Sequence, residues 1–267
     1  MRFSNINGQL VPAEEVNEFA RNLSVAGVLG MLETMLVLNG EIQLKNYHWQ
    51  RLRDGALLIG IPDIDTNSLE QAISDLIRKN ELDAICKIRL QVYPNDKQEL
   101  SQYAIEACAI QPELIVFNTS GLAAGIAQHS TKARGPLANC KTTDRSLYVA
   151  AEEFAKARQW DEAFVKNDSG RVIETAIYNV FWIKNNIVYT PPLSEGCVAG
   201  ISRRHLLAEL PRLGYTVEEH PLTEAMLYDA DEVFLSNAIR RIKWVAQIGD
   251  RIYSNSLSSE IASLLFP

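Results

Sequence analysis

Three segments in the first third of the chain and just beyond it are patterned as strands. Residues 1–12 and 32–44 each place apolar positions on both sides of an Asn-Gly pair, at Asn7-Gly8 and Asn39-Gly40. Asn-Gly is a strong hairpin signal because both residues tolerate the positive φ angles of a tight type I′ turn. Residues 84–94 alternate between apolar and polar positions, as a single strand does. We therefore predict two hairpins and a further strand in this part of the chain.

Five segments space their apolar residues at the intervals of an amphipathic helix. They are residues 44–60, 69–80, 144–160, 201–213 and 257–266. Asn67 or Ser68 is placed to cap the second of them, and Gly200 precedes the fourth. Strands and helices alternate unevenly along the chain, which predicts an α+β architecture rather than a doubly wound sheet.

Two further segments shape the predicted organisation. Residues 118–140 are dominated by Gly, Pro and small side chains, which predicts a loop that lines a site and connects two domains. Residues 171–183 are mostly apolar and predict one strand with a kink. With 267 residues, the chain is long enough for one large domain or two of ordinary size.

Composition narrows the classes of function. The chain is 47% hydrophobic and 22% charged, with a net charge of −7. A globular protein is expected, and the acidic balance argues against a nucleic-acid partner. No apolar run reaches the length of a membrane span. The four cysteines form no CxxC pair, so no metal site is predicted, and the absence of a signal-like N-terminus predicts a cytoplasmic protein with reduced thiols.

The densest set of chemically active residues lies between positions 141 and 202. Lys141 stands in CKTTDR, Glu174 in VIETAIYN, and Gly200-Ile201-Ser202 opens a predicted helix. An amine can bind a carbonyl compound, a carboxylate can hold a protonated nitrogen, and a helix N-terminus attracts phosphate. Taken singly, each has an ordinary alternative: a surface lysine, an exposed strand glutamate, and N-capping by Ser202.

Several motifs in order resemble one enzyme family. GMLETM followed by HWQRL, and IETAIYNVFW followed by TPPLSEGCVAGISR, are similar to the blocks of the class IV aminotransferases, the fold-type IV pyridoxal phosphate (PLP) enzymes. The resemblance implies a two-domain α+β fold like that of D-amino acid aminotransferases. It implies a smaller domain at 1–110, a larger one at 111–267 that carries the PLP lysine, and a homodimer.

The resemblance also implies roles for individual residues. Lys141 would hold PLP as an imine, Glu174 would hold the ring nitrogen, and Arg51 would bind the phosphate, although Arg51 also reads as a plain helix-face arginine. The remaining residues expected on the phosphate side are Ile201, Ser202, Ser236 and Asn237. A non-catalytic protein that kept the fold is disfavoured because Lys141, Glu174 and Arg51 are all present.

Three features resemble the 4-amino-4-deoxychorismate lyases of this family. They are the Lys141-Thr-Thr-Asp-Arg segment, the FLSNAIRRIKWV segment and the short length with its GDRIYSN ending. The implied reaction converts 4-amino-4-deoxychorismate to 4-aminobenzoate and pyruvate, a step of folate biosynthesis. The alternative is a transaminase acting on branched-chain or D-amino acids with 2-oxoglutarate.

The lyase reading assigns three more residues. Lys141 takes the Cα proton, and Lys141 or Thr34 returns a proton to the leaving group. The alternative for Thr34 is an ordinary β-branched strand residue that packs against its cross-strand neighbour. Arg89 is a candidate for a substrate carboxylate, with a strand-face ion pair as its alternative, and Arg145 is a weaker candidate for the same role.

Overall fold

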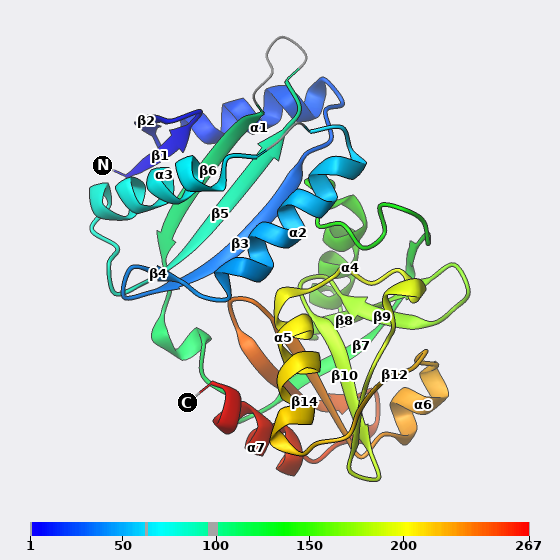
Figure 1. Cartoon of the computed structure of the whole chain (residues 1–267). Helices are drawn as coiled ribbons and strands as arrows, with labels where there is room; N and C mark the ends of the chain where they lie inside the picture. The colour runs from blue at the N-terminus through cyan, green and yellow to red at the C-terminus, as the bar shows by residue number, and fades with distance from the viewer. Residues whose placement is uncertain (1, 62–63, 96–100, 267) are drawn as a thin grey trace. The chain divides into compact units, whose positions relative to one another are not determined.

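The computed structural model describes residues 2–61, 64–95 and 101–266, and the chain divides into two compact units. Unit 1 takes the described residues up to Leu114 together with Cys140–Asp144, and unit 2 takes Ile115–Asn139 and the described residues from Arg145 onward. Figure 1 shows the elements of both units.

Unit 1 is built on a six-stranded antiparallel sheet in the order β2-β1-β6-β5-β3-β4. Its strands are β1 (Phe3–Ile6), β2 (Gln9–Pro12), β3 (Met31–Leu38), β4 (Glu41–Ile42), β5 (Ile85–Tyr93) and β6 (Gln102–Ala109). Both predicted hairpins are present, and Asn7, Gly8, Asn39 and Gly40 all take the positive φ that their turns require.

Helices cover both faces of this sheet. They are α1 (Glu15–Val25), α2 (Lys45–Leu58) and α3 (Thr66–Lys79), with a 3₁₀ turn at Pro112–Leu114. α2 and α3 bury their apolar stripes against one face in a single core, whereas Phe19 of α1 packs edge-on against Tyr93 on the other face. The predicted cap of α3 was wrong: Asp65 is the N-cap, and its carboxylate accepts from the amides of Asn67 and Ser68.

Unit 2 is organised around a closed ring of strands. Its strands are β7 (Leu122–Lys132), β8 (Glu162–Asn167), β9 (Val172–Thr175), β10 (Asn179–Lys184), β11 (Ile187–Thr190), β12 (Val217–Glu219), β13 (Glu232–Asn237), β14 (Arg241–Ile248) and β15 (Arg251–Ile252). The order β10-β13-β14-β7-β8-β9 returns to β10 through the pair Glu174 with Asn179. Apolar side chains such as Phe164, Trp182 and Leu235 fill the interior.

Helices pack around the ring of strands. They are α4 (Ser146–Lys156), α5 (Ile201–Glu209), α6 (Glu224–Asp229) and α7 (Ser256–Leu265), with 3₁₀ turns at Leu193–Glu195 and Pro211–Leu213. Leu206 and Ile261 share one apolar cluster with the outward-facing stacked rings of Phe181 and Phe234. Ala151 and Ala155 of α4 form a second cluster with Val165 of β8.

Two predictions about strands in unit 2 were wrong. Residues 122–132, predicted as loop, form β7, whose small residues pair in parallel with β8 and β14. The small side chains serve close packing, because a Cβ on Gly125 would lie 2.0 Å from Trp160 Cζ3. The single kinked strand predicted at 171–183 is instead the antiparallel strands β9 and β10, which reverse direction at residues 176–178.

The chain visits unit 1 twice, and the second visit carries Lys141. The Lys141 carbonyl accepts from Leu32 N at 2.8 Å, and Thr143 N donates to the Gly30 carbonyl at 2.9 Å. These bonds add residues 140–144 to the start of β3. The sequence prediction differs here, because it divided the chain after residue 110 and assigned the lysine to the larger domain.

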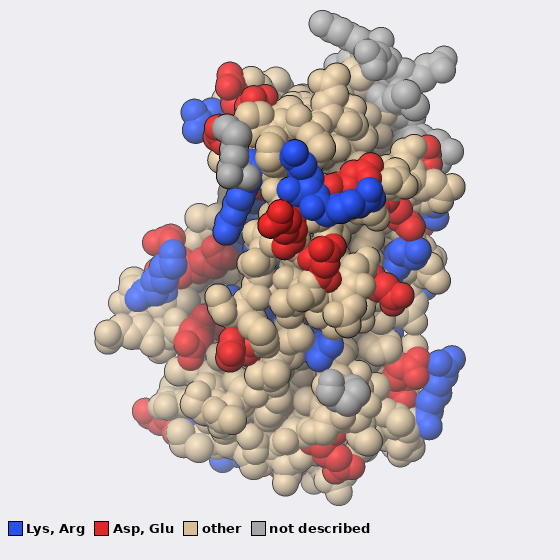
Figure 2. Space-filling model, turned by 90° about the vertical axis from the view of Figure 1, so that its left-hand side faces the viewer, with Lys and Arg blue, Asp and Glu red and all other residues tan. Residues whose placement is uncertain are grey.

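Among the described residues, no helix is long and apolar enough to cross a membrane. On the described part of the face drawn in Figure 2, acidic and basic side chains lie interspersed, and neither sign forms a broad area.

We predict that Gly125→Ala lowers the free energy of unfolding by about 1–3 kcal/mol, because the added methyl must displace the Trp160 ring. Urea unfolding measures the effect. The matched control is Gly135→Ala, since a Cβ at that glycine meets no atom within 4 Å. Equal stability of the two variants would contradict the packing role of Gly125.

Candidate active site

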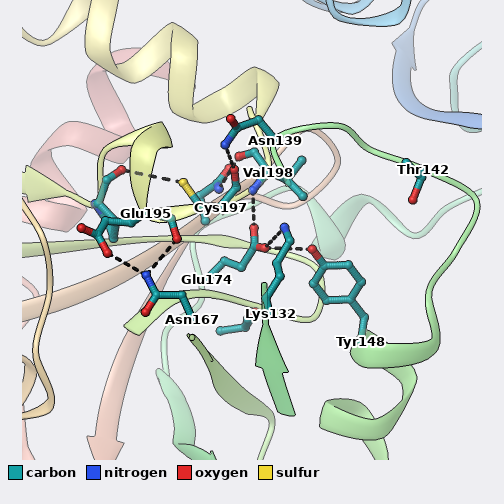
Figure 3. Close-up of polar contacts among 12 residues, drawn as sticks. Lys132, Asn139, Thr142, Tyr148, Asn167, Glu174, Glu195, Cys197 and Val198 are labelled. Carbon is teal, nitrogen blue, oxygen red and sulfur yellow. Dashed lines mark hydrogen bonds and ion pairs between the residues drawn. The ribbon is translucent and has the colours of Figure 1, made fainter. Parts of the chain in front are cut away.

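Glu174 on β9 is a buried and firmly hydrogen-bonded carboxylate of unit 2. It is 2% exposed, and three donors from three separate segments converge on it (Figure 3). Lys132 Nζ and Tyr148 OH each lie 2.8 Å from Oε1, and the Val198 amide lies 2.8 Å from Oε2. Such an arrangement stabilises the ionised carboxylate and fixes its plane.

The Tyr148 hydroxyl acts as a donor to this carboxylate. Burial raises the pKa of Tyr148, and the neighbouring Glu174 charge raises it further. The phenol therefore keeps its proton throughout the physiological range. Lys132 comes from the end of β7 and Tyr148 from α4, so the tertiary packing of unit 2 brings the cluster together.

Glu174 begins a row of polar residues across three strands. Asn179 on β10 pairs with Glu174, and Ser236 on β13 pairs with Asn179. Residues directly opposite in antiparallel strands share a face, so the three side chains line one surface. The hydroxyl of Ser236 is buried and has no hydrogen-bond partner within the described part of the chain. A buried polar atom of this kind calls for an acceptor or donor from outside the protein.

The start of α5 lies beside this row. Asn179 Nδ2 donates to the Val198 carbonyl at 2.9 Å, and a Cβ on Gly200 would lie 1.8 Å from Asn179 Oδ1. Gly200 is the N-cap and, within the described residues, no side chain caps α5, so its first amides are placed to donate to an external acceptor. Ser202 is buried and stands one residue inside the helix, which rules out the alternative of N-capping by Ser202.

Three asparagines hold the segment that leads into α5. Asn139 donates to the carbonyls of Leu193 and Cys197, and Asn167 donates to both the carbonyl and the carboxylate of Glu195 (Figure 3). Together with the bond from Asn179 to Val198, these contacts fix the amide that donates to Glu174. The segment is therefore a rigid part of the site.

Asn237 is placed in the turn after β13. Its Oδ1 accepts from the amides of Ile239 at 3.0 Å and Arg240 at 2.6 Å. The side-chain carbonyl thus shapes the turn, and any contact with a ligand would come from the Asn237 amide nitrogens. Arg145, the weaker candidate for a substrate carboxylate, donates to Glu152 at 2.6 Å at the start of α4.

Unit 1 contains a buried ionic triad on the face covered by α2. Arg51 donates through Nε at 2.8 Å and Nη2 at 2.6 Å to the two oxygens of Glu33, and His48 Nδ1 lies 2.6 Å from Oε2. The side chains of Glu33 and His48 are 1% exposed and that of Arg51 is 10% exposed. Glu33 therefore fixes the orientation of the arginine that the sequence assigns to phosphate.

The charges of this triad follow from its surroundings. Burial raises the pKa of Glu33, but the Arg51 and His48 contacts outweigh it and hold that pKa at about 2. Burial lowers the pKa of His48; Glu33 opposes this shift, whereas the charges of Arg51 and Lys141 add to it. His48 is therefore neutral and donates from Nδ1, and its Nε2 is buried without a partner among the described residues.

Thr34 and Arg89 lie together on the opposite face of the same sheet. Thr34 of β3 pairs directly with Arg89 of β5, and Arg89 pairs with Glu106 of β6. Arg89 Nε lies 3.8 Å from Glu106 Oε2, and both side chains are about half exposed. An exposed pair at this distance holds its partners weakly, which leaves Arg89 able to exchange Glu106 for another carboxylate.

Sequence reasoning missed four residues of these clusters: Glu33, Lys132, Tyr148 and Asn179. Glu33 and Asn179 stood inside the recognised motifs but received no role. The spacing of His48 and Arg51 by one helical turn was a usable signal for a shared buried acid. Lys132 and Tyr148 carried no local signal, since their contacts with Glu174 span 42 and 26 residues.

Among the described residues, no group of His, Cys, Asp and Glu could hold a metal ion.

Comparison with known proteins identifies relatives of two activities. The family model described as amino-transferase class IV matches residues 30–248. The aminodeoxychorismate lyase of Vibrio harveyi is 25% identical over 228 residues, which cover 82% of this chain and 83% of that protein. The branched-chain-amino-acid aminotransferase of Salmonella typhimurium is 29% identical over 215 residues, or 75% of this chain and 69% of the relative.

Solved structures confirm the predicted fold class. The branched-chain aminotransferase of Thermoproteus uzoniensis with norvaline superposes with a TM-score of 0.83 at 25% identity, covering 98% of this chain and 93% of that one. A Legionella pneumophila structure named for 4-amino-4-deoxychorismate lyase gives a TM-score of 0.78 at 26% identity, covering 90% and 91%. The family resemblance drawn from the sequence motifs is thereby confirmed as well.

We predict that Glu33→Gln lowers the free energy of unfolding at pH 7 by about 3–5 kcal/mol, because Arg51 keeps its buried charge without a carboxylate partner. Urea unfolding followed by circular dichroism measures the change. The matched control is Glu106→Gln in the same sheet, whose half-exposed ion pair should contribute about 1 kcal/mol or less.

The pH dependence of this difference has a definite sign. The pKa of Glu33 is depressed from 4.5 to about 2, so its stabilisation is complete above pH 4.5 and is lost as the pH falls to about 2. The difference in stability between wild type and Glu33→Gln should shrink across this interval. A difference that stays constant there would contradict the assigned charge of Glu33.

Proposed function

The chain belongs to the class IV aminotransferase family, and we propose that it is a PLP-dependent 4-amino-4-deoxychorismate lyase. The proposed reaction releases 4-aminobenzoate and pyruvate. The support comes from the way in which the residues of each unit match the parts of PLP and of this substrate.

The observation that carries the cofactor assignment is the row Glu174, Asn179 and Ser236. It joins a carboxylate fit for a ring nitrogen to a buried hydroxyl that lacks a partner. The two ends lie two strand spacings apart, about 10 Å, which suits a pyridine ring carrying a phosphate arm. The amides of Ile201 and Ser202 and the side chain of Ser236 would hold the phosphate, with Arg51 as its cation.

Lys141 is the amine that the proposal assigns to the cofactor carbonyl. The carbonyl and the ring nitrogen of PLP stand at opposite ends of the pyridine ring. Lys132 lies 2.8 Å from Glu174, which the proposal assigns to the nitrogen end, so this contact favours Lys141 over Lys132 for the carbonyl. When bound, PLP supplies an electron sink for the pair released at Cα. Lys141 Nζ then takes the Cα proton.

Thr34 and Arg89 support the lyase reading. Thr34 Oγ1 would donate a proton to the departing pyruvate, and Arg89 would hold a carboxylate of the substrate. Their direct pairing across β3 and β5 places both groups on one face of the sheet. Substrate would displace the weak contact of Arg89 with Glu106.

The relatives include enzymes with two different reactions. Lyase relatives match most of the chain, and branched-chain aminotransferases match it at similar identity. A transaminase would use the same Lys141, Glu174 and Arg51, and it would also need an oxoacid acceptor. The homodimer and the cytoplasmic location stay predictions.

Purified protein loaded with PLP should release pyruvate from 4-amino-4-deoxychorismate without any oxoacid acceptor. A lactate dehydrogenase assay detects the product. Thr34→Val should lower kcat by about 10²–10⁴-fold because the proton donor is lost, and Thr34→Ser should keep most of the activity. Lys141→Ala should carry no borohydride-reducible PLP adduct.

Two outcomes would contradict this assignment. Turnover of leucine with 2-oxoglutarate, with no pyruvate from the chorismate derivative, would make the protein a transaminase. A reducible adduct that persists in Lys141→Ala and maps to another lysine would displace Lys141 from its role.

A further inference from the structure

Lys132 places a positive charge on the carboxylate that we assign to the cofactor ring. Its Nζ lies 2.8 Å from Glu174 Oε1, and the side chains of Lys132 and Glu174 are only 13% and 3% exposed. Low exposure weakens screening by solvent, so this pair interacts more strongly than one on the surface. Figure 3 shows Lys132 and Tyr148 approaching the same end of Glu174.

The amine is held in place from a second direction. Lys132 Nζ lies 5.4 Å from the centre of the Tyr148 ring, within the range of a cation–π contact. Tyr148 in turn donates its hydroxyl proton to the same Oε1 atom. Lysine, tyrosine and glutamate therefore form a closed cluster in which each member fixes the other two.

Lys132 is also the charged member of the donor set. The other two described donors to Glu174 are a phenol and a backbone amide, and both are neutral. Burial and the Glu174 charge raise the pKa of Tyr148, so the phenol does not lose its proton to become a second anion. Charge compensation of Glu174 by these contacts comes from the lysine.

We infer that Lys132 is a positioning residue that sets how much negative charge Glu174 presents to the ring nitrogen of the cofactor. An uncompensated carboxylate would bind a proton on that nitrogen strongly, whereas a lysine-paired carboxylate binds it less strongly. Lys132 therefore lowers the proton affinity of the bound cofactor. This inference rests on the proposed function, since it presupposes PLP at Glu174.

The test follows the visible absorbance of the PLP-loaded protein as a function of pH. Lys132→Met removes the charge while keeping an unbranched side chain, and Lys132→Arg keeps the charge. In Lys132→Met the titration midpoint of the bound cofactor should rise by about one pH unit, because loss of a nearby cation favours every protonated form of the cofactor. Lys132→Arg should titrate close to wild type.

A second charge deletion serves as the matched control. Lys166 belongs to the same unit and pairs with Glu224 at 2.7 Å, outside the row that begins at Glu174. Lys166→Met should leave the midpoint unchanged.

Lys132→Gln separates charge from hydrogen bonding, since the amide can still donate to Glu174. It should shift the midpoint as Lys132→Met does, and it keeps the test decisive if the methionine variant fails to fold.

The outcomes separate this inference from the proposed function. Wild-type protein that binds no PLP would overturn both. PLP-loaded Lys132→Gln or Lys132→Met with a wild-type midpoint would overturn the role of Lys132 and leave the cofactor assignment standing. An equal shift in Lys166→Met would also overturn it, because the effect would then reflect net charge alone.

Discussion

One strand pair, Glu174 with Asn179, closes the ring of unit 2, and the candidate site is arranged from it. Closure leaves the strands of the ring without open edges and encloses an apolar core, so the backbone at Glu174 has little freedom to move. The same pair begins the polar row that ends at Ser236. The element that completes the fold of this unit therefore also presents Glu174, the acid that we propose binds the cofactor ring.

In unit 1 the corresponding constraint is the burial of a charged side chain, Arg51 of α2, in a fixed orientation. Glu33 meets the cost of burying Arg51 by accepting two of its hydrogen bonds, and His48 completes the carboxylate's coordination as a neutral donor. Lys141 reaches the neighbourhood of this triad because residues 140–144 pair with the start of β3. Lys141 thus shares one small region of unit 1 with Glu33, His48 and Arg51, which lie far from it in the sequence.

The sequence predicted what depends on local pattern or on motif. The Asn-Gly turns and helix α2 were predicted from the sequence and are present in the fold. Lys141, Glu174 and Arg51 were singled out from the motifs as candidate cofactor residues. β7 was missed because its Gly and Ala residues, selected for packing beneath Trp160, look like a loop in isolation. Lys132 and Tyr148 were missed because strand register and helix docking, rather than spacing, bring them to Glu174. The identity of the substrate likewise depends on side chains that family motifs do not fix.

The central claim is that Glu174 is the acid that binds the cofactor ring, and PLP affinity tests it most directly. Equilibrium dialysis of Glu174→Gln should show PLP binding weakened by about 10- to 100-fold, the loss of one charge-assisted hydrogen bond. Glu162→Gln is the matched control, because Glu162 is buried in the same unit on β8 and its pKa is raised by burial to about 7. It should bind PLP like wild type. Unchanged affinity in Glu174→Gln, or an equal loss in Glu162→Gln, would contradict the claim.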